Sequence, residues 1–165
     1  CKMPTTAIVS YSPEHQNALE EMLRHSYTRA GWPFDPEGKH ADIRRIPQVY
    51  QTGTGDFWLL LEDGRLIGAV ALRPLSAGVV ELQRLQVRPD ARGCGYGRHL
   101  LRHAIDQARQ RDVRHVRLDT TSRNTVALSM FRRAGFKDIP RYNDNPDAEF
   151  WMELDLKLVK ALQQK

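Results

Sequence analysis

The residues best suited to bind a charged ligand lie in a glycine- and arginine-rich segment near the middle of the chain. This segment reads Arg88-Pro89-Asp90-Ala91-Arg92-Gly93-Cys94-Gly95-Tyr96-Gly97-Arg98. Closely spaced glycines let the backbone approach a ligand and turn successive N–H groups into one concavity. An amphipathic helix is expected to begin here, and its N-terminal amides add to that concavity. The segment is therefore predicted to bind an anion, most simply a pyrophosphate.

Two common phosphate-binding patterns do not match this segment. A P-loop requires Lys and then Ser or Thr after its last glycine, whereas Arg98 and His99 follow here. The dinucleotide fingerprint requires Gly-x-Gly-x-x-Gly, whereas the third glycine comes one residue early, at Gly97. A tight turn between a strand and a helix that binds nothing remains the alternative.

The segment from Arg92 to Gly97 resembles the acyl-CoA pyrophosphate loop of the GNAT superfamily of N-acyltransferases. The preceding Leu85-Gln86-Val87 resembles the bulged strand of that family, which pairs with the pantetheine arm of CoA. The sequence from Asn124 to Phe136 resembles the second family signature. The resemblance covers residues 5–156 and implies an N-acetyltransferase domain, followed by a C-terminal tail at 157–165.

By this resemblance the acyl donor is acetyl-CoA, and no metal is implied. The backbones of Leu85 and Val87 would bond to pantetheine. Asn124 would contact either the thiol end of the cofactor or its pantetheine, and Phe131 would pack near it. The complete set of expected cofactor-binding residues is Leu85, Gln86, Val87, Arg92, Gly93, Cys94, Gly95, Tyr96, Gly97, Arg98, Asn124 and Phe131. For Asn124, capping of a helix N-terminus is a sufficient explanation, and both roles can coexist.

Glu81 is the candidate general base. It lies in an otherwise apolar strand start, and the resemblance puts the base of glutamate-using relatives at this position of the strand. A partly buried carboxylate can accept a proton from an ammonium group, directly or through water. The alternative is a structural ion pair between Glu81 and an arginine such as Arg84.

The general acid departs from the family pattern. Many relatives carry a tyrosine before x-x-x-Gly-Phe to protonate the leaving CoA, whereas this chain has Phe131. A thiol with a pKa of about 8.5 leaves tolerably as a thiolate, so the change puts the acid in doubt but not the activity. Tyr142 is the nearest substitute in the sequence. Its alternative role is that of a loop aromatic that lines the acceptor pocket or merely packs.

The acceptor is expected where the loops at 27–40 and 140–148 converge. Candidate contacts are Trp32, Phe34, Arg141, Tyr142, Asn143 and Asn145. Each signal is weak alone, because loop aromatics and asparagines often serve as turn formers. The histidines show no metal-ligand spacing: His99 and His103 lie one helical turn apart without a third ligand, so no metal site is predicted.

The elements that must position these residues follow from apolar periodicity and turn signals. Strands are expected at 7–9, 57–62, 65–72, 79–87, 113–120, 136–139 and 150–156, and helices after Ser12 and at 40–51, 97–111 and 124–134. Asp63-Gly64 predicts a two-residue hairpin turn, and Pro47 predicts a break in the second helix. The order predicts a single α/β (α+β) domain with a mixed, mostly antiparallel sheet flanked by helices.

The strand at 79–87 changes phase within itself. Its apolar positions are 80 and 82, and then 85 and 87. Such a slip predicts a β-bulge, which bends the strand and separates it from a neighbour. By the resemblance, the splayed strands form a V in which pantetheine lies.

Composition bounds the remaining classes. The chain has 165 residues, of which 41% are hydrophobic, enough for one domain whose core needs neither disulfides nor metal. It holds no apolar run long enough for a membrane span, and its first residues lack the apolar core of a secretion signal. Cys1 and Cys94 predict no disulfide framework, so the default is a reducing, cytoplasmic compartment.

The net charge of +5 is unevenly distributed along the chain. Residues 84–117 contain nine arginines and three acids, a local net charge of +6. Residues 138–155 contain six acids and one arginine, a local net charge of −5. Solvated faces explain this pattern; the alternative is an anionic ligand bound in the middle and a cationic one near the end.

Three function classes remain. The leading hypothesis is a soluble N-acetyltransferase that uses acetyl-CoA on an amine-bearing acceptor, either a small molecule or a peptide. The second is a non-catalytic acyl-CoA-binding or regulatory module, suggested by Phe131. Nucleic-acid binding ranks last, because the arginine-rich segment lacks interleaved aromatics, and no membrane partner is predicted. The sequence leaves a homodimer open.

Overall fold

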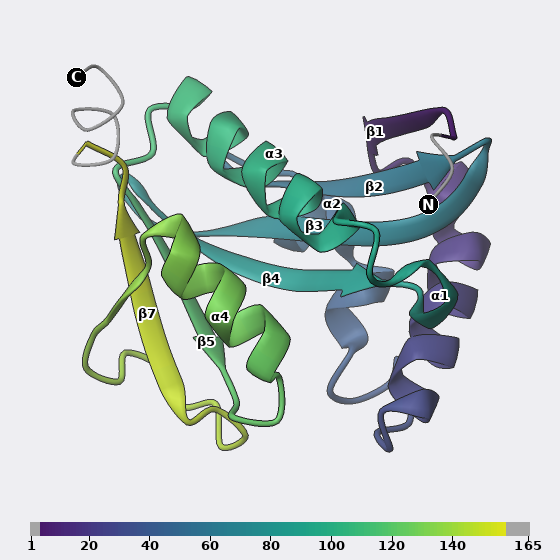
Figure 1. The fold of residues 1–165 in the computed structure, drawn as a ribbon. Helices are drawn as coiled ribbons and strands as arrows, with labels where there is room; N and C mark the ends of the chain where they lie inside the picture. Colours follow the sequence, from purple (N-terminus) through teal and green to yellow (C-terminus); the bar gives the residue numbers. More distant parts are fainter. Residues whose placement is uncertain (1–3, 158–165) are drawn as a thin grey trace.

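The chain folds around one seven-stranded sheet, as seen in a computed structural model that describes residues 4–157 (Figure 1). The strand order is β1-β2-β3-β4-β5-β7-β6, in which β4 and β5 are parallel and the other neighbours are antiparallel. The strands are β1 (Thr6–Ser10), β2 (Asp56–Glu62), β3 (Arg65–Ser76), β4 (Val79–Val87), β5 (His115–Thr120), β6 (Lys137–Asp138) and β7 (Phe150–Asp155). The mixed, mostly antiparallel sheet expected from the sequence is confirmed.

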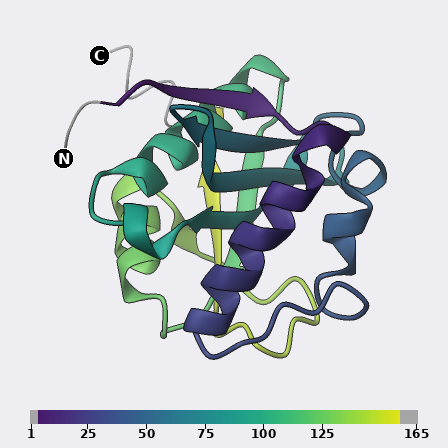
Figure 2. The same cartoon turned by 90° about the vertical axis from the view of Figure 1, so that its right-hand side faces the viewer.

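Helices cover both faces of this sheet. They are α1 (Gln16–Arg29), α2 (Ile46–Val49), α3 (Tyr96–Gln110) and α4 (Thr125–Ala134), with 3₁₀ turns at Pro13–His15, Ala41–Arg44 and Pro89–Ala91. In Figure 1, α3 and α4 lie in front of the sheet and α1 lies behind it. Figure 2, from the side, shows α1 crossing the strands obliquely. The predicted order of strands and helices is confirmed.

The apolar stripe of α3 makes the larger core. Leu100, Leu101 and Ala104 are almost fully buried against inward-facing residues of β2 to β5, together with Phe131 of α4. A second core lies on the opposite face, where Leu19 and other residues of α1 pack on the sheet. Burial of both faces of the central strands follows from having helices on each side.

The turn between β2 and β3 forms as its sequence predicts. Asp63 and Gly64 both have positive φ, at +49° and +84°. This backbone conformation matches the twist of the flanking strands and fixes the pairing of Glu62 with Arg65.

The predicted bulge in β4 is present at Arg84. Arg84 has a φ of +55°, and the pairing with β3 shifts between Ala69 and Ala71. Val80 and Leu82 face the α3 core before the bulge, and Leu85 and Val87 pack against that core after it. Pairing of β4 with β5 ends at Glu81, opposite Arg117, so β4 leaves β5 at this point. Figure 1 shows the two strands diverging.

The expected helix at 40–51 is instead two short turns. A 3₁₀ turn at Ala41–Arg44 is followed by α2, and Pro47 lies in the first turn of α2. Proline is tolerated there because that position needs no helical N–H donor. β3 extends to Ser76 rather than ending at Leu72. Most of the expected tail at 157–165 lies outside the described residues, and no helix within 4–157 is long and apolar enough to cross a membrane.

Gly68 of β3 is required by the close approach of α3. A Cβ added at Gly68 would lie 2.9 Å from Leu100 Cδ1 and 3.1 Å from the carbonyl oxygen of Gln86. We expect Gly68→Ala to lower the free energy of unfolding by about 1–3 kcal/mol through overpacking, measured by denaturant titration. Gly97→Ala is the control, since its Cβ would lie 3.8 Å from Met130 Sδ, an ordinary contact. Equal stability of the two variants would contradict this packing argument.

Candidate active site

The glycine-rich turn lies between β4 and α3, as the sequence predicts. Gly93 and Gly95 have φ values of +83° and +84°, a conformation that favours glycine. A Cβ at either residue would meet no atom within 4 Å, so the space beside this backbone is open. Gly95 caps α3, which leaves the first amides of the helix directed outward at its positive dipole end. The turn therefore offers an anion a set of N–H donors.

The side chains of this turn divide between solvent and protein contacts. Arg92 and Arg98 are exposed, and Arg92 Nε donates to the carbonyl of Val87 at 3.2 Å. The hydroxyl of Tyr96 donates to the Glu62 carboxylate, so this side chain is directed away from the turn. Cys94 is disulfide-bonded. The sequence analysis, which expected no disulfide framework, did not predict this bond, because the sequence around Cys94 carries no spacing signal for it.

Beyond the bulge, one edge of β4 is left without a strand partner. The N–H of Arg88 donates to the carbonyl of Ile67 in β3 at 2.8 Å. Successive residues of a strand direct their peptide groups to opposite edges. The backbone N–H and C=O groups of Val87, and of Leu85 two residues earlier, therefore face the gap between β4 and β5. An extended ligand can pair with this edge. Gln86 is paired with Ala69 of β3.

A cavity of about 800 Å³ opens where β4 and β5 separate. It joins the free edge of β4 to polar groups on the α1 side of the sheet. Its lining includes Glu81, Gln83, Leu85, Gln86, Asn124, Phe131, Tyr142, Asn143 and Asn145. The cavity therefore brings together the strand-edge residues and the base candidate that the sequence singled out.

Glu81 is buried at the base of this cavity, with 7% of its surface exposed. Tyr142 donates its hydroxyl proton to Glu81 Oε2 at 2.6 Å, and Asn143 Nδ2 donates to the same oxygen at 3.2 Å. Gln83 Nε2 donates to Oε1. Glu81 also sits in register between Arg73 of β3 and Arg117 of β5. The carboxylate is thus held by neutral donors, with a cation on each neighbouring strand.

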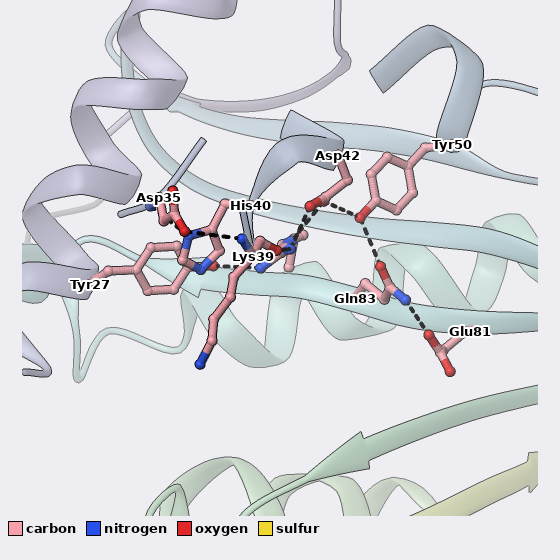
Figure 3. Close-up of polar contacts among 9 residues, drawn as sticks. Tyr27, Asp35, Lys39, His40, Asp42, Tyr50, Glu81 and Gln83 are labelled. Carbon is pink, nitrogen blue, oxygen red and sulfur yellow. Dashed lines mark hydrogen bonds and ion pairs between the residues drawn. The ribbon is translucent and has the colours of Figure 1, made fainter. Parts of the chain in front are cut away.

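Arg84, the alternative partner for Glu81, binds elsewhere. Its guanidinium holds Asp42 in two hydrogen bonds, from Nη2 at 2.6 Å and from Nε at 2.9 Å. Figure 3 shows the chain of contacts that continues from Asp42 through Tyr50 and Gln83 to Glu81. The structural ion pair expected as the alternative for Glu81 is therefore wrong, because the left-handed backbone of Arg84 turns its side chain toward Asp42.

Tyr142 belongs to the loop before β7, and other contacts of this loop fix its position. Asn143 Nδ2 donates to Asp119 Oδ2 at 2.7 Å, and Asn145 Nδ2 donates to Asp119 Oδ1 at 3.0 Å. Trp151 Nε1 donates to Asn143 Oδ1 at 2.9 Å. Burial, and then the hydrogen bond to Glu81, raise the pKa of Tyr142 well above its usual value. Tyr142 therefore keeps its proton and shares it with Glu81.

Phe131 and Asn124 line the cavity from the α4 side. Phe131 is 5% exposed and packs against Phe136, with ring centroids 5.8 Å apart. Asn124 occupies the N-cap position of α4, as predicted, but its side chain makes no capping hydrogen bond. The asparagine side chain is exposed at the cavity wall.

The loops at 27–40 and 140–148 converge, since Lys39 Nζ lies 3.3 Å from Asp147 Oδ2. Three of the expected acceptor contacts nevertheless lie outside the cavity lining. Phe34 is buried against Tyr27 and His40, and Trp32 lies beneath the guanidinium of Arg123. Arg141 stacks on Trp151. Tyr142, Asn143 and Asn145 do line the cavity.

The acidic segment at 138–155 is largely neutralised by cations elsewhere in the chain. The ion pairs are Arg132–Asp138, Lys39–Asp147, Arg117–Glu153 and Arg114–Asp155. These partners come from separate elements, so the local charge in the sequence is not a local charge in space. This pairing gives no support to a cationic ligand at the segment. Among residues 4–157, no group of His, Cys, Asp or Glu side chains is arranged to hold a metal ion.

Comparison with known proteins supplies the family. A model of the Acetyltransferase (GNAT) family matches residues 17–136, more than half of the chain. The chain belongs to the GNAT acetyltransferase family. It is an acyltransferase. Glu81, Gly93 and Gly95 all lie inside the matched range.

Curated relatives are named as acetyltransferases. YjgM of Escherichia coli K12, an uncharacterized N-acetyltransferase, is 28% identical over 127 residues, 74% of this chain and 76% of that protein. Streptothricin acetyltransferase of Streptomyces lavendulae is 44% identical over 101 residues, 61% of this chain and 48% of that protein. The chain thus spans about half the length of the second relative.

Solved GNAT structures share the fold. An acetyltransferase from Staphylococcus aureus Mu50 superposes with a TM-score of 0.83 at 19% identity, covering 92% of this chain and 99% of that one. The PaiA N-acetyltransferase of Thermoplasma acidophilum, in complex with coenzyme A, has a TM-score of 0.69 at 23% identity. It covers 92% of this chain and 99% of that one.

Gly95→Val tests the anion-binding turn of this GNAT chain. A β-branched residue in the left-handed region costs about 1–2 kcal/mol, so the turn should change shape and misdirect its amides. We expect the dissociation constant for CoA to rise about tenfold or more in calorimetry.

Gly31→Val is the matched control for this measurement. Gly31 has a φ of +85° and open space around it, but it follows the end of α1 and is not part of the glycine-rich turn. It should lose similar stability and keep the parent affinity for CoA. Parent-like CoA binding by Gly95→Val would refute the assignment of the turn.

Proposed function

We propose that this protein is an N-acetyltransferase that transfers an acetyl group from acetyl-CoA to a primary amine by direct attack. The observation that carries the proposal is the buried Glu81 carboxylate, which lies in the cavity where β4 and β5 separate. The amine acceptor would be a small molecule or a peptide.

The donor half of the site would run along β4 to the start of α3. The amides from Gly93 to Arg98 would bind the pyrophosphate, with Arg92 and Arg98 adding positive charge. Leu85 and Val87 would pair with pantetheine through their backbones. The hydrogen bond from Arg88 to Ile67 supports this pairing, because it leaves the peptide groups of Val87 directed away from β3. Asn124 and Phe131 would lie near the thioester, since both line the same cavity.

The chemistry needs an unprotonated amine. Glu81 would accept a proton from the acceptor ammonium, directly or through water, and the amine lone pair would then attack the thioester carbonyl carbon. Collapse of the tetrahedral intermediate breaks the C–S bond and releases CoA as a thiolate, and the attacking nitrogen loses its second proton to solvent as the neutral amide forms. A free backbone N–H beside the bulge would polarise the carbonyl oxygen.

Departure of CoA would need little help from a protein acid. Phe131 has no proton to give, and a thiol of pKa about 8.5 is a tolerable leaving group. Tyr142 donates to Glu81, and its pKa is raised by burial and by that hydrogen bond. Both facts support a role for Tyr142 in holding the base, with solvent protonating the thiolate.

The relatives are consistent with several acceptors. One is named for acetylation of streptothricin, whereas a mycothiol acetyltransferase of Cellulomonas flavigena is 32% identical over 145 residues. The second candidate function is a non-catalytic acyl-CoA-binding module. Phe131, where many relatives have a proton donor, is the observation that favours it.

Glu81→Gln tests the base. It should lower kcat by about 10²–10⁴-fold and flatten the acidic limb of the pH–rate profile, because the amide cannot take up a proton. Affinity for acetyl-CoA, measured by calorimetry, should change little. Unchanged turnover and an unchanged profile would move the base to ordered water or to the free-base fraction of the acceptor.

Phe131→Tyr and Tyr142→Phe test the departure of CoA. Phe131→Tyr should keep or raise turnover, since its added hydroxyl would point at the sulfur. Tyr142→Phe should lower kcat by about tenfold, the effect of losing one hydrogen bond to a charged group. A loss of about 10³-fold or more would make Tyr142 the acid instead.

The same assay separates enzyme from module. Acetyl-CoA consumption is measured with a broad panel of amines for the parent and for Phe131→Tyr. If both proteins bind CoA tightly and neither consumes acetyl-CoA above background, the enzyme assignment fails and the module remains.

A further inference from the structure

We propose that Gln83 and Tyr50 form a hydrogen-bond relay that positions Glu81 and adjusts to its protonation, with the Asp42–Arg84 ion pair as the fixed end. The catalytic consequence rests on the proposed function of Glu81 as the base. The relay itself stands on contacts within the protein.

The relay crosses from the bulge to the cavity in three steps (Figure 3). The Tyr50 hydroxyl lies 2.6 Å from Asp42 Oδ2 and 2.8 Å from Gln83 Oε1. Gln83 Nε2 contacts Glu81 Oε1. Glu81 and Gln83 lie two residues apart on β4, so their side chains share one face. Tyr50 is fully buried, which keeps its hydroxyl out of water.

The relay can respond to the protonation of Glu81 because it holds fewer protons than acceptors at Tyr50. A tyrosine hydroxyl carries one proton, yet the Tyr50 oxygen is within hydrogen-bonding distance of two acceptors, on Asp42 and Gln83. Burial, followed by the charge of Asp42, raises the pKa of Tyr50, so that proton stays on the phenol. It can be donated to only one of the two oxygens at a time.

One arrangement suits an ionised Glu81. Gln83 donates its N–H to the carboxylate, and Tyr50 donates its proton to the Gln83 carbonyl. Asp42 then keeps the two hydrogen bonds from Arg84. Burial raises the pKa of Asp42, but the hydrogen bonds and charge of Arg84 outweigh burial, so the pKa is lowered. In this arrangement each group of the relay has a hydrogen-bond partner, and only the contact between Asp42 and Tyr50 lacks a proton.

The other arrangement suits a protonated Glu81. When Glu81 has taken the proton of the acceptor ammonium, its O–H can donate to the carbonyl of Gln83 once that amide has turned about its last bond. Gln83 then donates to the Tyr50 oxygen, and Tyr50 donates to Asp42. The covalent position of no other proton changes, so both states of the base stay hydrogen-bonded.

The hydrogen bond between Gln83 and Glu81 differs in strength between the two arrangements. A hydrogen bond to a charged group is stronger than one between neutral groups, so the N–H of Gln83 stabilises the carboxylate more than its carbonyl stabilises the acid. The variants in the test below change none of the other ionisable groups that face this region. These groups are Arg73 of β3, Arg84 of β4, Arg117 and Asp119 of β5, Glu153 of β7, Tyr142 of the loop before β7, Asp42 of the 3₁₀ turn and Tyr27 of α1.

The decisive experiment titrates Glu81 in the free protein. Glutamate is labelled with ¹³C at Cδ, and the Glu81 resonance is identified by its loss in Glu81→Gln. In Gln83→Met and in Tyr50→Phe the titration midpoint should move upward by about 0.5–1 pH unit, because the donor to the carboxylate is lost or loses its anchor.

Tyr11→Phe is the matched control. The Tyr11 hydroxyl donates to Gln16 Oε1 at 2.5 Å, a partly buried tyrosine–glutamine hydrogen bond, and Tyr11 belongs to the same core as Tyr50. It has no contact with Glu81, so its removal should leave the midpoint unchanged. A midpoint that moves equally in Tyr11→Phe would overturn the relay, since general loosening of the core would then explain the shift.

The outcomes are separate from those of the proposed function. An unmoved midpoint in Tyr50→Phe overturns the relay whether or not the enzyme turns over; if that variant does not fold, an unmoved midpoint in Gln83→Met does so. The acidic limb of kcat/KM should follow the midpoint in the same variants. A shifted midpoint with an unshifted limb would retain the relay and reject Glu81 as the base.

Discussion

The ion pair between Arg84 and Asp42 holds the bend on which both halves of the site depend. Arg84 adopts a left-handed conformation within β4, which costs an L residue about 1–2 kcal/mol. Its two hydrogen bonds to Asp42, with side chains only 19% and 16% exposed, anchor the residue in that conformation. The bulge reverses the phase of β4 and ends its pairing with β5 at Glu81.

This bend places the free edge of β4 and the Glu81 carboxylate next to the same gap between β4 and β5. After it, Leu85 and Val87 pack toward the α3 core, and the edge of β4 that leads to the glycine-rich turn is free. Before it, Glu81 points to the opposite face, among the donors of the loop that precedes β7. A ligand lying in the gap between β4 and β5 therefore reaches both the helix N-terminus and the buried carboxylate.

Charge in this protein is balanced across the sheet rather than along the chain. Arg73, Glu81, Arg117 and Glu153 lie in register on four neighbouring strands, and Arg117 Nε donates to Glu153 at 2.8 Å. Arginines of the basic segment 84–117 thus pair with acids of the segment 138–155, as Arg114–Asp155 and Arg117–Glu153 show. Because Arg117 is paired with Glu153, the hydrogen bonds to Glu81 come from the neutral side chains of Gln83, Tyr142 and Asn143.

Local patterns in the sequence determined the elements and the glycine-rich turn between β4 and α3. The phase slip, the Asp63-Gly64 turn and the glycine-rich turn each act over a few residues, where backbone sterics and strand alternation dominate. The residues that hold Gln83 and Arg84 from outside the sheet were decided only by the tertiary structure. Asp42 and Tyr50 lie about forty and thirty residues from β4, and no spacing rule relates them to it. Gln83 was within reach of sequence reasoning, since it shares a strand face with Glu81. The direction of the Arg84 side chain could not be predicted from the sequence. Its left-handed backbone turns the side chain away from its strand neighbours and toward Asp42, which only the folded structure brings near.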